Sequence, residues 1–172
     1  QCLVGSEMCI RDSRYTVETI IKKGGKTIDK YLTPFGIRSV KFDKDKGFFL
    51  NNKHLKLKGM CLHQDAGCLG TAVPDRAYER RLLILKEFGT NAIRCSHNPP
   101  SPEFLNYCDS IGFLVIDEAF DKWKSGYYEE FFDSSWQQDI SDMVIRDRNH
   151  PSVILWSCLL YTSPSPRDTE RS

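Results

Sequence analysis

The chain has 172 residues, of which 40% are hydrophobic and 27% are charged, as in a globular protein of one domain or slightly more. Its 24 basic and 23 acidic residues are interspersed and leave a net charge of +1. This balance gives no electrostatic reason to expect nucleic acid or an anionic membrane as a partner. No apolar run approaches the roughly 20 residues that a membrane-spanning helix requires, so we expect no transmembrane segment.

Both ends of the sequence differ in pattern from their neighbours. Residues 1–13 and 158–172, which contain CLVGSEMCIRDS and CLLYTSPSPRD, have neither helical nor strand periodicity. We interpret them as translated adapter sequence that is not native to the protein, and we exclude them from the fold prediction. The remaining cysteines are expected to be reduced, buried thiols rather than disulfides: Cys61, Cys68, Cys95 and Cys108.

Residues 14–46 are patterned as antiparallel β-structure. Strand-like runs are separated first by Gly24-Gly25 and then by Pro34 and Gly36. We interpret this region as the end of a small antiparallel domain.

Residues 47–59 contain two further strand-like runs, one on each side of Asn51-Asn52. Asparagine tolerates the positive φ of a tight turn, so this pair predicts a hairpin.

From Gly59 onward, short apolar strands alternate with helical patterns. Asp75 and Ser101 are the expected N-caps of the first two helices, and Gly89 and Gly112 are their expected ends. The expected strands are 60–63, 91–95, 113–117 and 152–156, and the expected helices are 75–88, 101–112 and 134–147.

This alternation predicts an α/β fold with a parallel sheet and right-handed crossovers. The sheet could be open and doubly wound, or it could be part of a (β/α)8 barrel. A doubly wound fold usually carries a glycine-rich phosphate loop after its first strand. The segment HQDAGCLGTAVPD has Gly67 and Gly70 but neither G-x-G-x-x-G nor G-K-[ST], so we expect no nucleotide site.

Polar side chains recur where four successive strands are expected to end. In both architectures these ends meet at one edge of the sheet. A buried ion without a partner costs roughly several kcal/mol, so these groups should either pair with one another or bind a polar ligand. Pairing of Arg94 with Asp117 or Glu118 is the purely structural alternative, but recurrence at four strand ends favours a site. The residues are His63, Gln64, Asp65, Arg94, Ser96, His97, Asp117, Glu118 and Ser157.

A zinc site is a second interpretation of the same region. Cys61-x-His63 and Cys95-x-His97 could bring two thiols and two imidazoles together from neighbouring strands. Cysteine in a buried strand more often serves as a small hydrophobe, so we rank this interpretation last and expect no metal.

An aromatic-rich loop, FDKWKSGYYEEFF, follows the third strand. Its aromatic side chains, Trp123 in particular, could stack on the apolar face of a sugar ring or could simply pack the loop onto the body. The position of the loop beside the strand ends favours the first role.

The segments NAIRCSHNPPSPEFLNYCDSIGFLVIDEAFDKW and RDRNHPSVILWS closely resemble glycoside hydrolase family 2, the group of β-galactosidases, β-glucuronidases and β-mannosidases. The likeness extends over residues 14–157. It implies that residues 14–46 are the end of an immunoglobulin-like β-sandwich, and that residues 47–157 are the first half of a (β/α)8 TIM barrel.

The resemblance also implies retaining hydrolysis by two glutamates, without a cofactor. In the family, the acid/base glutamate follows the HPSVILWS-like segment within a Gly-Asn-Glu, whereas Ser157 is followed here by CLLYTS. Neither catalytic glutamate can therefore be assigned, and we expect the chain alone to be inactive. The resemblance implies that Arg94 fixes the nucleophile in its ionised form. It implies substrate binding by His63, Asp65, His97, Asp117, Glu118 and Trp123.

Two departures from the family pattern concern the substrate-binding segments. The family often has His-Tyr-Pro where this chain has His97-Asn98-Pro99, and many relatives have His-His-Asp in place of His63-Gln64-Asp65. The first variant resembles the bacterial β-galactosidase-like branch, which predicts a terminal β-linked sugar as substrate. The alternatives are a β-glucuronidase or β-mannosidase of the same family, or a carbohydrate-binding module that was never catalytic.

Overall fold

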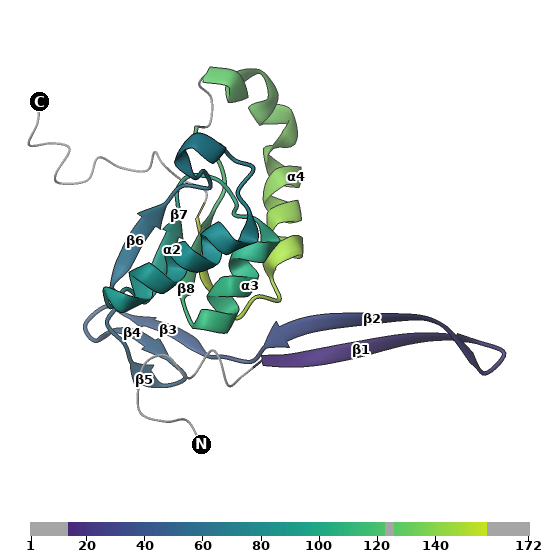
Figure 1. The fold of residues 1–172 in the computed structure, drawn as a ribbon. Coiled ribbons are helices and arrows are strands. Elements are labelled where there is room, and N and C mark those ends of the chain that lie inside the picture. The colour runs from purple at the N-terminus through teal and green to yellow at the C-terminus, as the bar shows by residue number, and fades with distance from the viewer. Residues whose placement is uncertain (1–13, 123–125, 158–172) are drawn as a thin grey trace, which may run out of the picture.

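The computed structural model describes residues 14–122 and 126–157, and these form nine strands, three α-helices and two short 3-10 helices (Figure 1). The adapter-like segments 1–13 and 158–172 lie outside the described residues. The strands are β1 Arg14–Lys23, β2 Lys26–Gly36, β3 Val40–Asp43, β4 Gly47–Leu50, β5 Lys53–His54, β6 Gly59–Leu62, β7 Ala92–Cys95, β8 Leu114–Glu118 and β9 Val153–Ser157. The helices are η1 Gly67–Leu69, α2 Asp75–Glu87, α3 Pro102–Ile111, η2 Gly126–Tyr128 and α4 Glu129–Asp147.

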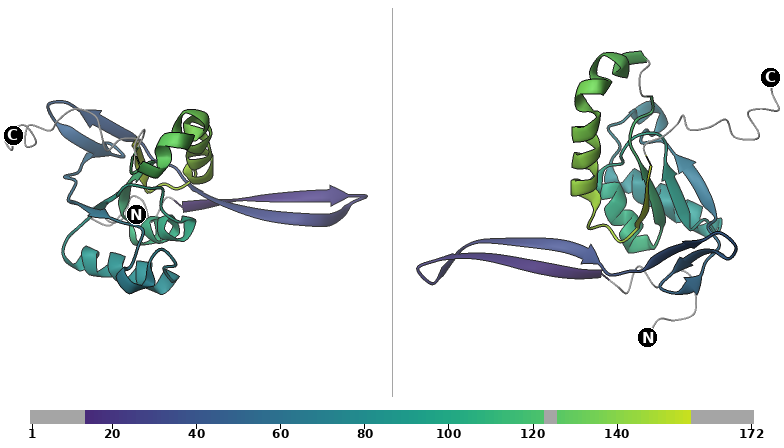
Figure 2. Two further views of the ribbon diagram at one scale, coloured as in Figure 1. Left: turned by 90° about the horizontal axis from the view of Figure 1, so that it is seen from above. Right: turned by 180° about the vertical axis from the view of Figure 1, so that it is seen from behind.

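Strands β1 and β2 form an antiparallel hairpin that extends away from the rest of the chain (Figures 1 and 2). Its turn is Gly24-Gly25, where both residues have positive φ, as the sequence predicts. All of β1 and most of β2 are exposed, including Ile20, Ile21 and Tyr31. A two-stranded hairpin without a packed face is only marginally stable in water, so this element requires further packing partners.

Strands β3, β4 and β5 form a small antiparallel sheet. Its β4–β5 turn is Asn51-Asn52 with φ of 51° and 63°, which confirms the predicted hairpin. Strand β3 lies within the range expected for the sandwich domain, yet it pairs with β4. Within residues 14–46, the hairpin β1–β2 is thus the part that stands apart from the later strands.

Strands β6, β7, β8 and β9 form a parallel sheet, as predicted, and their order in the sheet is the chain order. Each successive pair is joined by a crossover that contains a helix. The three α-helices lie on one face of this sheet, and the right-hand view of Figure 2 shows the opposite face, which carries no helix among the described residues. This arrangement has the form of part of a barrel wall with its inner side open.

Alternation along the strands sends neighbouring residues to opposite faces of the sheet. Ile93 and Val115 belong to the core beneath α2 and α3, whereas Ala92 and Leu114 pack against β4 of the small antiparallel sheet. Arg94 lies two residues after Ala92, and Glu118 lies four residues after Leu114. Their side chains therefore point to the same inner face as Ala92 and Leu114. The same rule assigns Cys95 and Asp117 to the helix face.

Local capping explains the bounds of α3. Ser101 Oγ accepts a hydrogen bond from the backbone N–H of Phe104 at 3.2 Å, and Pro102 occupies the first helical turn. Gly112 ends the helix in the left-handed conformation, with φ of 91°. The roles of Ser101 and Gly112 confirm the prediction from the sequence.

The other two helices differ from prediction at their first residues. The N-cap of α2 is Pro74, and Asp75 is the first helical residue. At that position the negative charge of Asp75 still stabilises the N-terminus of the helix. Helix α4 begins at Glu129, five residues before the predicted start, so it includes the end of the aromatic-rich loop. Phe132 in that segment packs with Phe120 and Met143 as a small core under the helix.

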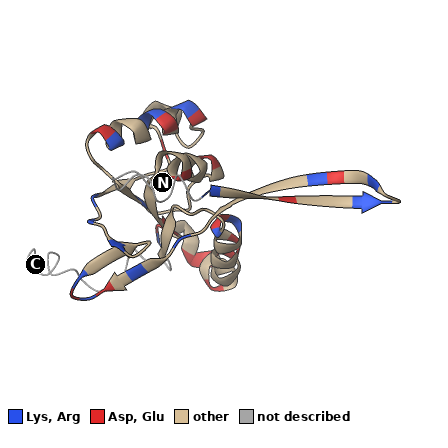
Figure 3. Ribbon diagram, turned by 90° about the horizontal axis from the view of Figure 1, so that it is seen from below, with Lys and Arg blue, Asp and Glu red and all other residues tan. Residues whose placement is uncertain are grey.

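All four cysteines within the described residues are free. Cys95 and Cys108 are buried as predicted, but Cys61 and Cys68 are exposed, so the prediction of burial was wrong for half of them. Lys and Arg are interspersed with Asp and Glu along the helices and the hairpin (Figure 3). In the part of the chain that the structure describes, no helix combines the length and the hydropathy needed to cross a bilayer.

Candidate functional site

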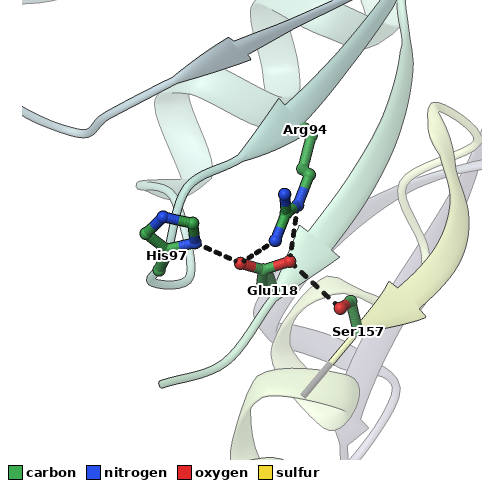
Figure 4. Close-up of polar contacts among 4 residues, drawn as sticks. All are labelled: Arg94, His97, Glu118 and Ser157. Carbon is green, nitrogen blue, oxygen red and sulfur yellow. Dashed lines mark hydrogen bonds and ion pairs between the residues drawn. The ribbon is translucent and has the colours of Figure 1, made fainter. Parts of the chain in front are cut away.

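Glu118, the last residue of β8, is completely buried and forms the centre of a polar network (Figure 4). Arg94 donates to both of its oxygens, from Nε to Oε2 at 2.8 Å and from Nη2 to Oε1 at 3.0 Å. His97 Nδ1 lies 2.7 Å from Oε1, and Ser157 Oγ donates to Oε2 at 3.0 Å. Three of the four strand ends therefore meet at one carboxylate.

The register of the parallel strands produces this meeting. Glu118 is paired with Ser157 of β9, and Arg94 is level with Ile116, one inward-facing position below Glu118. The long arginine side chain spans that one step to reach the carboxylate. His97 is the second residue after β7, and its peptide bond to Ser96 is cis.

The network keeps Glu118 ionised. Burial raises the pKa of this carboxyl, but the hydrogen bonds from Arg94, His97 and Ser157 outweigh burial and hold the pKa below its ordinary value. The same contact with Glu118 raises the pKa of Arg94. Because both oxygens are occupied, Glu118 suits a positioning role better than that of an acid or a nucleophile.

An open cavity of about 460 Å³ lies beside this network and is lined by His63, Gln64, Asp65, His97, Asn98 and Asp121. The rings of His63 and His97 meet edge to face, with their centroids 5.7 Å apart. His97 thus belongs to both the cavity and the network, and its second ring nitrogen points away from Glu118 (Figure 4). Imidazoles, carboxylates and amides of this kind can bind the hydroxyl groups of a polar ligand.

Five of the seven predicted site residues are brought together here: His63, Asp65, Arg94, His97 and Glu118. Trp123 lies outside the described residues. Asp117 is separated from the others, because it is fully buried on the helix face and neighbours Asp147 of α4. Its prediction as a sugar ligand treated Asp117 and Glu118 as one unit, whereas consecutive strand residues point to opposite sides of the sheet.

Sequence reasoning missed Asp121, Asn98 and Arg81 as parts of this region. Asp121 and Asn98 follow strand ends closely, and that position was a usable signal for both. Arg81 lies inside α2 and gave no such signal. It donates to the backbone carbonyls of His63 at 3.3 Å and Asp65 at 2.8 Å, and it thereby holds the segment after β6 in place.

The geometry does not support the zinc interpretation. Cys95 packs in the core beneath the helices, and burial raises the pKa of its thiol well above the ordinary value, so it does not supply a thiolate. His97 instead contacts Glu118 on the inner side. Within 14–122 and 126–157, no three His, Cys, Asp or Glu side chains are grouped to hold a metal ion.

Residues 40–160 match the family model described as "Glycosyl hydrolases family 2, TIM barrel domain". The chain is 50% identical over 147 residues to the β-galactosidase BoGH2A of Bacteroides ovatus, a match that covers 83% of this chain and 17% of that protein. It is 44% identical over 147 residues to a putative β-glucuronidase of Formosa agariphila, with 83% and 14% covered.

Two solved structures are similar to the fold. One is a family 2 member from Bacteroides cellulosilyticus, with a TM-score of 0.79 and 50% identity, covering 84% of this chain and 19% of that one. The other is a β-glycosidase from Bacteroides vulgatus, with a TM-score of 0.82 and 42% identity, covering 91% and 21%. The chain spans about a fifth, or less, of the length of these four relatives.

Proposed function

Because the chain belongs to family 2 of the glycosyl hydrolases and matches their TIM barrel domain, we propose that it supplies part of the substrate-binding wall of a retaining glycosidase that acts on terminal β-linked sugars. The observation that carries this proposal is the cavity of six polar side chains beside the ionised Glu118. The hairpin β1–β2 is proposed to be the end of an immunoglobulin-like sandwich.

In this proposal, His63, Asp65 and His97 bind sugar hydroxyls. The contact between His97 and Glu118 fixes the orientation of the imidazole, so that its other nitrogen is available to the ligand. Asp117 is omitted from this set, because its carboxyl lies on the helix face. Glu118 acts by orienting His97 and Arg94.

Arg94 is proposed to orient the nucleophile of the complete site. Its side chain is 34% exposed while it remains held by Glu118, so a further carboxylate could approach the guanidinium from the open side of the sheet. Such a contact favours the ionised nucleophile. We assign neither catalytic glutamate to a residue of this chain, and we expect the chain alone to have no activity.

A neutral galactoside fits the cavity better than a uronic acid does. Asp65 and Asp121 line it, and among the described residues that line it none is Lys or Arg. Two carboxylates near the ligand repel a glucuronate carboxylate, whereas they can accept hydrogen bonds from sugar hydroxyls. This supports the β-galactosidase-like assignment over the β-glucuronidase alternative.

Sugar binding tests the proposal directly. We expect methyl β-galactoside to shift the NMR signals of His63 and His97, and glucuronic acid at equal concentration to shift them much less. His63→Ala should weaken binding about tenfold, the equivalent of one hydrogen bond. His54→Ala is the matched control, because His54 is exposed on β5 and does not line the cavity.

Three results would contradict parts of this proposal. Absence of any sugar-dependent shift at His63 and His97 contradicts the binding role. Stronger binding of glucuronic acid contradicts the preference for a neutral sugar. Turnover of a chromogenic β-galactoside above a heat-treated control contradicts the expected inactivity of the chain.

A further inference from the structure

Asp117 is a buried acid without a conventional partner. Its side chain is fully inaccessible, and neither carboxylate oxygen has a hydrogen-bond donor in good geometry among the described residues. A charged group in such a place is costly, so Asp117 must either be neutral or share a proton. The proposed sugar-binding residues do not partner the Asp117 carboxyl, because they lie on the other face of the sheet.

An acidic side chain beside Asp117 is that of Asp147, the last residue of α4, which is also fully buried. Arg146 binds both oxygens of Asp147, with Nε to Oδ1 at 2.7 Å and Nη2 to Oδ2 at 2.6 Å. Arg146 also donates to the backbone carbonyl of Pro100 at 2.7 Å. This bidentate contact places the positive charge of Arg146 directly against the Asp147 carboxylate.

The surroundings make Asp117 the protonated member. Burial, and then the negative charge of Asp147, raise the pKa of Asp117 to about 7, while Arg146 lowers it in part. The other titratable groups near Asp117 are Cys95 on β7, whose thiol is neutral, and Glu118 on its own strand. Two neighbouring carboxyls in a buried space repel each other if both are ionised.

We propose that Asp117 and Asp147 share one proton and form a clasp that fixes the end of α4 against β8, directly behind the site carboxylate Glu118. With the proton present, the Asp117 hydroxyl donates to the Asp147 carboxylate. When the proton leaves, two adjacent negative charges remain in a buried space. The clasp then loosens. Through the intact clasp, Asp117 and Asp147 act as positioning residues for the Glu118 network.

This inference is independent of the sugar-binding proposal and is tested without a ligand. We would label the aspartate side-chain carboxyl carbons with 13C and follow their NMR shifts from pH 4 to 9. Wild-type protein should show one aspartate signal with a midpoint near 7. Asp117→Asn should abolish that midpoint, because the amide donates permanently to Asp147.

Asp147→Asn provides the reciprocal test. It removes the neighbouring charge and offers Asp117 an amide donor, so the midpoint of Asp117 should shift downward by at least one pH unit, a tenfold change in the proton affinity. Asp142→Asn is the matched control, because Asp142 lies exposed on the same helix and should leave the midpoint unchanged.

A positioning role also requires that the titration of Asp117 alters the Glu118 network. The backbone amide signals of His97 and Ser157, neither of which is adjacent to Asp117 in sequence, should move with the same midpoint near 7 in wild type, and this movement should vanish in Asp117→Asn. A merely structural role for Asp117 would not produce this pH profile.

Infrared spectra of the wild-type protein keep the proposal falsifiable even if a variant does not fold. A band from a protonated carboxylic acid should be present at pH 6 and reduced at pH 8. The proposal is overturned if this band is absent at pH 6, if every aspartate titrates below pH 5, or if the midpoint near 7 persists in Asp117→Asn.

Discussion

Arg94 and Glu118 form a two-point ion pair across neighbouring strands, with N–O distances of 2.8 and 3.0 Å. The pair lies on the inner side of the parallel sheet, and Glu118 has no exposed surface. Because His97 and Ser157 contact the same carboxylate, one side chain fixes the relative positions of three strand ends. The site therefore depends on the charge of Glu118.

Glu118→Gln should destabilise the protein by about 2 to 3 kcal/mol. The amide removes the negative charge, and its NH2 group cannot accept the hydrogen bonds that one carboxylate oxygen accepts now. Chemical unfolding would measure the loss. Glu79→Gln is the control, because Glu79 pairs with the exposed Arg76 and should change stability by less than about 1 kcal/mol. Equal effects of the two substitutions would contradict the central role of Glu118.

The stability of the protein should fall as pH rises from about 4 to about 7. An unfolded aspartate releases its proton near its ordinary pKa of 3.8, whereas folded Asp117 retains it up to a pKa of about 7. Over this range the folded state binds more protons, so rising pH favours unfolding, by roughly 3 kcal/mol in total. Glu118 affects stability in the opposite direction. The stability that its ionised form contributes is present above about pH 4.5, its ordinary pKa, and is lost as pH falls through its lowered pKa.

Unfolding curves of wild type and Asp117→Asn at several pH values would check this expectation. The variant should show a flatter profile between pH 4 and 7 and should equal or exceed wild type in stability at pH 8. A wild-type stability that rises steadily from pH 4 to 7 would argue against a protonated Asp117.

Asp109→Asn should cost about 2 to 3 kcal/mol of stability. Asp109 lies on α3, where one oxygen is 2.7 Å from His150 Nδ1 and the other accepts the backbone N–H of Ser152 at 3.0 Å. These contacts hold the turn that leads into β9. The asparagine can serve only one of the two donors and leaves the other buried and unsatisfied. Asp142→Asn, on an exposed helix face, should be nearly neutral in the same unfolding measurement.

Arg81→Ala should weaken sugar binding more than it weakens the fold. Arg81 holds the carbonyls of His63 and Asp65, so its removal frees the segment that carries two cavity residues. We expect binding of methyl β-galactoside to weaken about tenfold while stability changes by about 1 kcal/mol. Arg80→Ala is the control, because the neighbouring Arg80 lies exposed on the same helix. An equal loss of binding in both variants would exclude a specific role for Arg81.

The purified chain should associate rather than remain monomeric. Strands β6 and β9 are the edges of the parallel sheet, and they expose Met60, Leu155 and Trp156. The hairpin β1–β2 exposes further apolar side chains. Unpaired edges and contiguous apolar surface promote association. Sedimentation velocity would measure the oligomeric state, and a monomer that melts cooperatively would show this expectation to be wrong.

The features predicted well from the sequence are those set by neighbouring residues. The cap of α3 by Ser101 and its end at Gly112 depend on side chains within one turn of the helix. The parallel sheet followed from alternating apolar strands and helices, and its strand ends indicated where Arg94, His97 and Glu118 would meet. The start of α4 was missed because its first turns have no clear apolar face and the aromatic stretch resembles a loop.

The features missed depend on contacts between distant segments. Nothing near Arg81 in sequence shows that its guanidinium reaches the carbonyls after β6. The partner of Asp117 is thirty positions later, at the end of α4. Strand alternation alone could have separated Asp117 from Glu118, but naming Asp147 as its neighbour required the packed structure.

The apolar plug formed by Phe48 and Leu50 against Ala92 and Leu114 seals the end of the sheet at which the parallel strands begin. A small molecule cannot reach His97 from that end, so it must arrive from the open inner side of the sheet or past the opposite rim. The segments after β6, β7 and β8 line the cavity at that rim, so their positions limit how a ligand enters and leaves it.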